Sequence, residues 1–255
     1  MQLDYSAFCD QGDRNYNEDS IGISEVLSPT ACFVLADGLG SHGMGDVASQ
    51  AAVDEALKTM VGHTDNCTNL IRSAFTNAQK RILFEQQSHD AKSKMKTTMV
   101  LLFIDDQKAY FGHIGDSRLY HFHRGKTKKL TSDHSVPQML VTAGEIKEAD
   151  IRFHPDRNRL LRALGADDEE VPRCAVCDSP VQLKKGDGLL LCSDGFWEYI
   201  TEAEMHRIYS KAESPLQWIE QMVEIVKQNG KGKNMDNFSA IAVAVGWKGA
   251  RKWLL

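Results

Sequence analysis

The stretch ACFVLADG, residues 31–38, indicates how this chain folds. Its first six residues are apolar and rich in strand-forming types, and the aspartate and glycine that follow them suit a turn. The same arrangement returns in DGLLLCSDG, residues 187–195, where a second apolar run ends at Asp194 and Gly195. We therefore predict buried strands over 31–36 and 187–193, each with a carboxylate at its end.

Further strands and helices are predicted around these two segments. Apolar, β-rich runs cover 98–105, 108–114, 117–123 and 238–246, and Arg124 with Gly125 begins a short antiparallel return. Helical periodicity occurs at 47–61, 68–87 and 214–228. Because helices and strands come in blocks and do not alternate one by one, the order favours an antiparallel α+β layered architecture over a parallel Rossmann-like sheet.

Composition and charge argue against several classes of protein. The 255 residues carry a formal net charge of -5, which gives no general attraction to nucleic acid or anionic lipid. No apolar run approaches the roughly 18–20 residues that span a bilayer, and acidic residues interrupt any signal-peptide core near the N-terminus. Since no linker, repeat or low-complexity tract divides the chain, we expect a single domain over residues 1–255.

The cysteines and histidines give weaker signals. The six cysteines are scattered, which is typical of a reduced, cytoplasmic compartment, and Cys192 lies in an apolar run where a free thiol packs as a small hydrophobe. Cys174 and Cys177 have C-x-x-C spacing, but no second pair accompanies them, so a flexible surface loop is the favoured interpretation. His121 and His123 alternate along one predicted strand and can share a face, yet a metal-ligand pair there is the less favoured interpretation.

Aspartates recur at the rims of the predicted sheets. The positions are Asp19, which closes an Asn-Glu-Asp triplet, Asp37, Asp116, Asp194 and Asp236. A single Asp-Gly pair is most often only a turn. Several such rims bring carboxylates close together, however, and clustered carboxylates repel one another unless cations neutralise them. Oxygen-rich clusters of this kind suit Mg²⁺ or Mn²⁺ and not zinc.

Two further residues extend this candidate site. Gly38 has no side chain, so its carbonyl can approach an ion closely. Arg14 lies five residues before Asp19, where a guanidinium can grip phosphate oxygens with two prongs. Alone, an arginine near an acidic triplet is more often a surface ion pair; its interest comes from the aspartates around it.

Together these segments resemble the protein phosphatase 2C family, the metal-dependent PPM-type Ser/Thr phosphatases, and above all its compact bacterial branch. The matching motifs occur in the family's order: R-x-x-N-E-D at 14–19, D-G-L-G at 37–40, G-D-S-R at 115–118, S-D-G at 193–195 and D-N at 236–237. The resemblance implies a central sandwich of two antiparallel β-sheets flanked by helix pairs, in α-β-β-α layers, with residues 133–175 as a variable flap.

The resemblance also implies a role for each matching residue. Two Mn²⁺ or Mg²⁺ ions would be held by Asp37, which bridges them, the Gly38 carbonyl, Asp194 and Asp236. Asp116 would bind a third, weaker ion together with Asp194. Glu18 and Asp19 would orient metal-bound waters, and Arg14 would bind the substrate phosphate. The expected activity is hydrolysis of phosphoserine and phosphothreonine on proteins by in-line attack of a metal-bridging hydroxide, without a phosphoenzyme.

One position departs from the family pattern. Some members carry a histidine two residues after the bridging aspartate as a proposed general acid, whereas this chain has Leu39 there and its nearest histidine is His42. Our hypothesis for the proton donor is water on the third ion, which depends on Asp116. His42 and another metal-bound water are the alternatives.

Two other functions are weighed against the protein phosphatase. A two-metal hydrolase of small phosphoesters or nucleotides would share the metal site and differ in the flap. A non-catalytic phosphate-sensing domain should have lost a metal carboxylate, but Asp37, Asp194 and Asp236 are all present. The expected partners are phosphorylated proteins and a cognate Ser/Thr kinase, in signalling by a cytoplasmic monomer. The tail at 248–255 is interpreted as a frayed terminus, in preference to a segment that docks on a partner.

Overall fold

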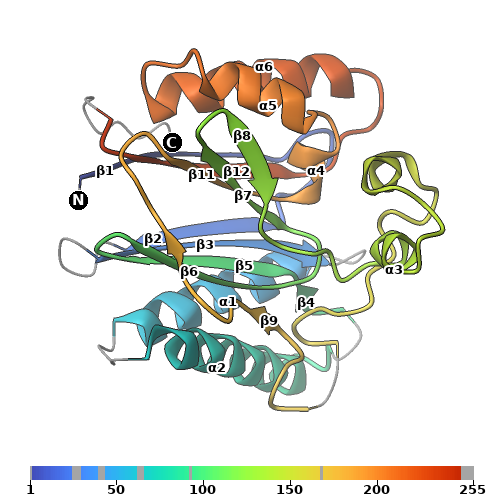
Figure 1. Cartoon of the computed structure of the whole chain (residues 1–255). Coiled ribbons are helices and arrows are strands. Elements are labelled where there is room, and N and C mark those ends of the chain that lie inside the picture. Colours follow the sequence, from blue (N-terminus) through green and yellow to red (C-terminus); the bar gives the residue numbers. More distant parts are fainter. Residues whose placement is uncertain are drawn as a thin grey trace.

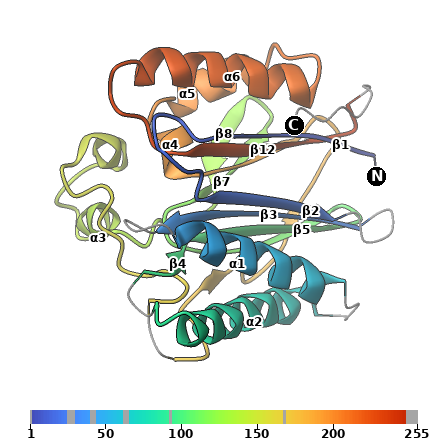
Figure 2. The same cartoon turned by 180° about the vertical axis from the view of Figure 1, so that it is seen from behind.

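The computed structural model describes residues 2–24, 30–39, 44–61, 66–91, 94–166 and 169–247. Two antiparallel β-sheets lie face to face, and helices cover the outer face of each (Figure 1). The view from behind shows the same four layers (Figure 2). The predicted α+β fold with α-β-β-α layers is therefore confirmed.

The two sheets differ in size. The first has the strand order β1 (Leu3–Asp10), β12 (Phe238–Val245), β11 (Gly188–Cys192), β7 (Arg118–His123) and β8 (Lys126–Lys129). The second has the order β10 (Val181–Gln182), β6 (Lys108–Ile114), β5 (Met99–Asp105), β3 (Thr30–Leu39) and β2 (Asp19–Ser24). Two short strands join it, β4 (Lys96–Thr97) against β3 and β9 (Ala175–Val176) against β6.

Helices cover the outer faces in pairs. Helices α1 (Gly45–Met60) and α2 (Cys67–Ser88) lie on the second sheet, and α5 (Glu202–Tyr209) and α6 (Pro215–Gly230) lie on the first (Figure 1). Helix α3 (Val136–Thr142) and the 3-10 helix η1 (Glu148–Phe153) stand at one side of the sandwich, and the short α4 (Asp194–Trp197) follows β11. Among the described residues, no helix is both long and apolar enough to cross a bilayer.

Local sequence explains where the main helices begin. The Asn66 side chain accepts the first-turn N–H of Asn69 at the start of α2, and Ser214 does the same for Gln217 at α6. Pro215 occupies the first turn of α6, where its missing N–H costs nothing. The helices predicted over 47–61, 68–87 and 214–228 are present within a few residues of these bounds.

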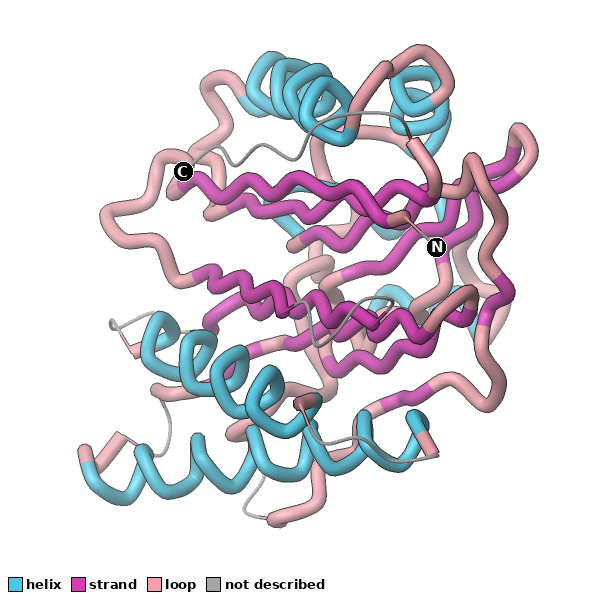
Figure 3. Tube along the Cα trace, turned by 90° about the vertical axis from the view of Figure 1, so that its left-hand side faces the viewer, coloured by secondary structure: helices cyan, strands magenta, loops and turns pink. Residues whose placement is uncertain are grey.

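The core has three apolar layers, two between helices and sheets and one between the sheets. Figure 3 shows the stacked helices and sheets between which they lie. Small residues such as Ala52 let α1 approach its sheet, while Trp218 fills the layer under α6. Phe33 and Leu191 face each other's sheets in the central layer and are fully buried. Because apolar groups removed from water supply most of the folding free energy, these layers fix how the strand ends meet.

Two local predictions need correction. Strand β3 does not end before Asp37 but continues to Leu39, because it leaves β5 after Leu35 and pairs with β4 from Gly38. Cys174 and Cys177 do not lie in a flexible surface loop; they flank β9, and the Cys177 sulfur accepts the backbone N–H of Phe111 on β6 at 3.3 Å. The thiols are therefore fixed beside a short sheet strand.

Candidate metal centre

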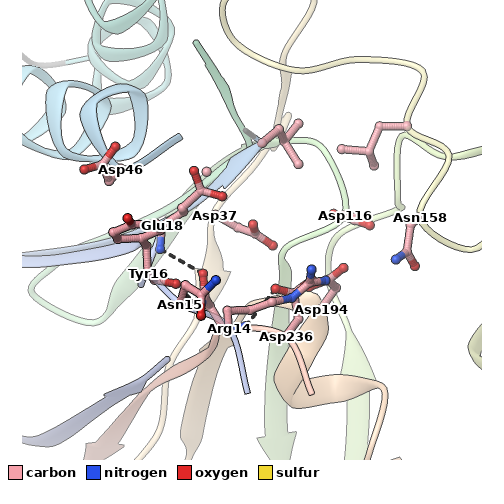
Figure 4. A pocket seen from close by; sticks show the side chains of 14 residues that line it. Arg14, Asn15, Tyr16, Glu18, Asp37, Asp46, Asp116, Asn158, Asp194 and Asp236 are labelled. Atoms are coloured by element: carbon pink, nitrogen blue, oxygen red, sulfur yellow. Dashed lines mark hydrogen bonds and ion pairs between the residues drawn. The ribbon is translucent and has the colours of Figure 1, made fainter. Parts of the chain in front are cut away.

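A cavity of about 810 Å³ lies at one end of the two sheets, beside Asn158 and Leu160 of the segment that follows α3 and η1. Its lining includes every predicted site residue except Asp19: Arg14, Glu18, Asp37, Gly38, Asp116, Asp194 and Asp236. Residues without a predicted role complete it: Asn15, Tyr16, Leu39, Asp46, Asn158, Leu160 and Asn237. Figure 4 shows the carboxylates between Asp46 on α1 and Asn158 on the opposite side.

Besides Asp46 on α1, four aspartates line the cavity, and they come from both sheets. Asp37 lies on β3 in the second sheet, whereas Asp194 follows β11 and Asp236 precedes β12 in the first. Asp116 lies on the connection that passes from β6 in the second sheet to β7 in the first. The cluster therefore forms only when the two sheets are packed together.

The backbone of Asp37 is held by two threonines. Thr98 N and Thr97 Oγ1 each donate to the Asp37 carbonyl at 2.8 Å, and Asp37 N donates to Thr98 Oγ1 at 3.2 Å. These bonds satisfy the strand edge where β3 changes partner. The carboxylate is thus carried on a fixed backbone and not on a mobile turn.

The charges of Asp37 and Asp194 act on each other across the cavity. Burial raises the pKa of Asp37 well above its usual range, and the charges of Asp194, Asp19 and Asp116 raise it further. Burial, followed by the charge of Asp236, raises the pKa of Asp194 to about 6. The cluster thus resists carrying several negative charges unless a cation joins it.

Asp116 is positioned by aromatic and basic side chains. Trp197 donates its indole N–H to the Asp116 carbonyl at 3.0 Å. The Arg118 guanidinium lies 3.4 Å from the centre of the Trp197 ring and holds Asp133 with two nitrogens, at 2.6 Å for the shorter pair. Burial first, and then the charge of Asp194, raises the pKa of the Asp116 carboxyl well above its usual range.

Asp19 lies beside the cavity but not on its wall. It stands opposite Asp37 in the β2–β3 ladder and is 7% exposed. Ser193 donates to Asp19 Oδ2 at 2.8 Å, while Oδ1 is buried without a hydrogen-bond partner among the described residues. Burial, with added repulsion from Asp194, raises the pKa of Asp19 to about 7. An orphaned buried oxygen of this kind calls for a water or an ion.

Gly38 occupies a corner that admits no side chain. A Cβ atom there would lie 2.3 Å from the Gly45 carbonyl oxygen and 2.6 Å from that of Glu18. Gly38 N donates to Glu18 O at 3.0 Å, and Glu18 Oε1 accepts Gly45 N at 3.1 Å. Glu18 therefore joins β3 to the first turn of α1. A carboxylate there also interacts favourably with the positive end of the helix dipole.

Arg14 and Asp236 form an ion pair at the cavity mouth. Arg14 Nη2 lies 2.7 Å from Asp236 Oδ2, and both side chains are substantially exposed. Arg14 is the only basic side chain among the described lining residues. The structure thus places the Arg14 guanidinium next to the carboxylate cluster; its binding of phosphate stays a prediction.

Asn237 is a positioning residue to which the sequence analysis assigned no role. Its Nδ2 donates to the carbonyls of Gln11 and Tyr16, at 2.8 and 2.9 Å, and its Oδ1 accepts Glu18 N at 2.8 Å. It thereby ties the segment that carries Arg14 and Glu18 to the start of β12. The only sequence signal was its place directly after Asp236.

The donor set fits hard divalent cations. The cavity presents buried carboxylate oxygens whose pKa values are raised by burial and by one another, and its described lining contains no histidine or cysteine. Mg²⁺ and Mn²⁺ prefer such oxygen ligands, whereas zinc favours nitrogen and sulfur. His42 and Gly40 lie outside the described residues, and Leu39 on the cavity wall has no proton to donate.

Comparisons with known proteins agree with this site. The family model "Protein phosphatase 2C" matches residues 11–238. The chain is 32% identical over 235 residues to "Serine/threonine phosphatase stp" of Listeria innocua, covering 90% of each chain. Its fold is similar to that of Stp1 from Staphylococcus aureus, with a TM-score of 0.85, 26% identity and coverage of 98% and 96%. It is also similar to the catalytic domain of PstP in complex with two manganese ions, with a TM-score of 0.80, 25% identity and coverage of 95% and 97%.

Proposed function

This chain belongs to the protein phosphatase 2C family and is a metal-dependent Ser/Thr protein phosphatase, and we propose that the carboxylate cavity carries its chemistry. The observation that carries the proposal is the meeting of Asp37, Asp194 and Asp236 from two sheets in one cavity. Each is separated from the next by long stretches of chain. Bound cations would neutralise the repulsion among carboxylates held this close together.

The proposed metal ligands follow from this geometry. Asp37, the Gly38 carbonyl, Asp194 and Asp236 hold two Mn²⁺ or Mg²⁺ ions, and Asp116 with Asp194 holds a third. When bound, the ions neutralise the carboxylates and lower the pKa of water toward neutrality, which supplies the nucleophile. Asp19, whose Oδ1 has no hydrogen-bond partner among the described residues, is proposed to orient water at the edge of the cluster.

Arg14 is the proposed phosphate-binding residue. A guanidinium offers two parallel N–H donors to phosphate oxygens, and it stabilises the charge that spreads over them in the transition state. Its exposed position at the mouth makes it accessible to a phosphate on a protein surface. Glu18 is proposed to orient water at the ions, and Asn237 fixes both its backbone N–H and the segment that carries Arg14.

Proton donation to the leaving serine or threonine oxygen is proposed to depend on Asp116. The neutral side chain of Leu39 cannot supply the proton, whereas Asp116 is a carboxylate on the cavity wall. The Trp197 bond to its backbone keeps it in place. The function of Asp116 is therefore separable from that of the ligands shared by the first two ions.

Residues 133–175 are proposed to act as a flap that meets the protein substrate. Asn158 and Leu160 from this segment line the cavity. The segment is tied to the α4 region by Arg157, whose Nε lies 2.7 Å from Glu198 Oε1, and by Arg152, which donates to the carbonyls of Trp197 and Ile200. A flap anchored beside Asp194 can link substrate contact to the reacting phosphate.

We also propose that residues 1–255 act as one domain and as a monomer, because the carboxylate cluster is complete within one chain. The phosphate that it removes must be placed by a Ser/Thr kinase, which makes such a kinase its functional partner. A cytoplasmic location is supported by six free cysteines, as expected in a reducing compartment.

The test is phosphate release from a phosphothreonine peptide. We expect turnover with Mn²⁺, none with EDTA, and none with Mn²⁺ for Asp194→Ala. Turnover of a nucleotide monophosphate above that of the peptide would favour the small-phosphoester alternative. Undiminished peptide turnover by Asp194→Ala, or in EDTA, would overturn the proposed site.

A further inference from the structure

A second group of potential metal ligands lies far from the cavity. His121 and His123 are near the end of β7, and Asp187 directly precedes β11. Strand β7 starts next to Asp116 at the cavity and runs away from it. At about 3.3 Å per strand residue, the histidines lie roughly 15–25 Å from Asp116. This group is therefore separate from the proposed catalytic site.

The strand register brings the three side chains together. Strands β7 and β11 pair with His121 opposite Leu189 and Phe122 opposite Gly188, so the next position opposite His123 is that of Asp187. Alternation along both strands puts all three side chains on the same sheet face. That face is the inner one, since Leu189 belongs to the layer between the sheets.

Each carboxylate oxygen of Asp187 meets one imidazole. Asp187 Oδ2 lies 3.0 Å from His121 Nε2, and Oδ1 lies 2.6 Å from His123 Nδ1. One ligand atom from each residue can be chosen so that all lie within 4.8 Å of one another. The Asp187 side chain is 2% exposed, against 11% for His121 and 30% for His123, so the group is closed on the protein side and open toward His123.

The carboxylate is fixed in advance. Lys184 N donates to Asp187 Oδ2 at 3.0 Å, and the Asp187 carbonyl accepts Val245 N at 2.9 Å from β12. Among the described residues, its ion-pair partners are the two histidines. A buried carboxylate with two imidazole nitrogens at hydrogen-bond distance offers a cation three converging ligands.

We propose that His121, His123 and Asp187 form a site for a divalent metal ion of intermediate softness, with Zn²⁺ as the preferred ion. Two imidazole nitrogens and a carboxylate oxygen are a common zinc ligand set, with bonds of about 2.0–2.2 Å, and water can fill the fourth position on the open side. Tetrahedral bonds of this length separate neighbouring ligand atoms by about 3.3 Å. The two oxygen–nitrogen contacts of 2.6 and 3.0 Å would widen toward this value, and one ligand atom from each residue already lies within 4.8 Å of the others.

The ligand chemistry separates this site from the catalytic one. The cavity offers only oxygen ligands in its described lining, which suit Mg²⁺ and Mn²⁺, whereas nitrogen ligands favour Zn²⁺ or Cu²⁺. In the β7–β8 register, Lys126 and Lys128 on β8 lie opposite His123 and His121. Their ammonium charges weaken cation binding to some degree. An ion here would join β7 to the turn before β11 and so stabilise the sheet without entering the phosphatase reaction.

The experiment uses untagged full-length protein whose catalytic site is saturated with Mg²⁺. Zn²⁺ binding is measured by calorimetry, and Cu²⁺ is used as a spectroscopic probe because coupling to imidazole nitrogen is visible in its electron paramagnetic resonance. The test variant is His121→Gln/His123→Gln. The matched control is His89→Gln, which removes an exposed histidine that also faces a carboxylate, Glu85, on α2.

We expect the wild type and His89→Gln to bind one more Zn²⁺ than the double variant and to show nitrogen coupling to Cu²⁺ that the double variant lacks. The loss of affinity should exceed about tenfold, since even outer-shell changes cost that much. Asp187→Asn keeps the side-chain shape, and it serves as the deciding variant if the double variant does not fold. Equal Zn²⁺ binding in wild type and folded variants, or copper without nitrogen coupling, would overturn the proposal.

Discussion

Arg14 Nη2 lies 2.7 Å from Asp236 Oδ2, so the proposed phosphate-binding group is paired with a proposed metal ligand. Their side chains are 47% and 38% exposed, and an ion pair this exposed contributes only about 0–1 kcal/mol. Each side chain can therefore give up this ion pair for another partner. Asp236 can turn to a cation and Arg14 to a phosphate with little loss of stability.

Replacing Arg14 by glutamine should lower kcat/KM for phosphothreonine peptides about 10- to 150-fold, because a hydrogen bond to a charged group contributes about 1.5–3 kcal/mol. Steady-state kinetics with saturating Mn²⁺ measure the effect. Arg14→Lys keeps the charge without the planar fork, so its kcat/KM should lie between those of the wild type and Arg14→Gln. Unchanged kcat/KM in Arg14→Gln would exclude a phosphate-binding role.

Replacing Asp37 by asparagine should lower kcat at least about a thousandfold, since several kcal/mol of metal-dependent stabilisation are lost. In EDTA, the same variant should be as stable as the wild type or more stable, because a buried, repelled carboxyl becomes a neutral amide. Urea unfolding with EDTA and with Mg²⁺ measures both states. A large loss of stability in EDTA would instead indicate a purely structural aspartate.

Asp116→Ala should slow peptide turnover while leaving the affinity of the first two Mn²⁺ ions nearly unchanged. The reason is that Asp116 is proposed to bind only the third ion, for which Asp194 is the other proposed ligand. Calorimetric titration of Mn²⁺ and single-turnover kinetics separate the two effects. Wild-type turnover in this variant would end the hypothesis that Asp116 supports proton donation.

Arg157→Gln should affect protein substrates more than small ones. Burial, followed by the charge of Asp194, raises the pKa of Glu198 to about 7, and Arg157 is the ion-pair partner that opposes this. Without it the flap loses an anchor near Asp194. We expect kcat/KM to fall severalfold for a phosphoprotein and little for p-nitrophenyl phosphate. An equal fall for both substrates would place the effect in the metal site and not in the flap.

The stability of the protein should fall in mild acid because of His134. Its Nδ1 accepts Gly115 N at 3.2 Å, and burial, followed by the nearby His113, lowers its pKa to about 3. The unfolded state, with a pKa near 6.5, therefore binds more protons, and the stability present above about pH 6.5 is lost as pH falls toward the folded value.

His134→Asn offers an uncharged acceptor in a similar position, so its unfolding free energy should depend less steeply on pH between 6.5 and 4 than that of the wild type. Urea titrations in EDTA at a series of pH values provide the comparison. Parallel pH curves for the two proteins would show that His134 is not the group responsible.

Local patterns predicted much of the fold, and particular residues show where they stopped. The apolar runs before Asp37 and Asp194 predicted two central strands, and helical spacing predicted α1, α2 and α6. Strand β1 was not predicted, because Asp4 and Ser6 make it appear polar although both are buried in the folded chain. Helix α5 was also missed, although the sequence TEAE at 201–204 contains the capping box that starts it.

The candidate site divides in the same way. Local sequence patterns mark its carboxylates but not the residues that hold them in place. Asn237 hydrogen-bonds Glu18 from 219 positions away, and Ser193 hydrogen-bonds Asp19 from 174 positions away. His121 and His123 were correctly expected to share a face, yet the third member of their group, Asp187, lies 64 residues beyond His123. Contacts at such distances depend on sheet packing, which no local spacing encodes.

Asp19 and Asp37 belong to one sheet while Asp194 and Asp236 flank strands of the other, so the divalent ions that we propose at this edge would link the two sheets. Neither half of the architecture can retain them by itself. Ion occupancy therefore reports on completed assembly, and an ion that binds only the native state stabilises it by RT ln(1 + [L]/Kd). A fluctuation that separates the sheets at this edge would release the ions and silence turnover before the cores beneath the helices unravel.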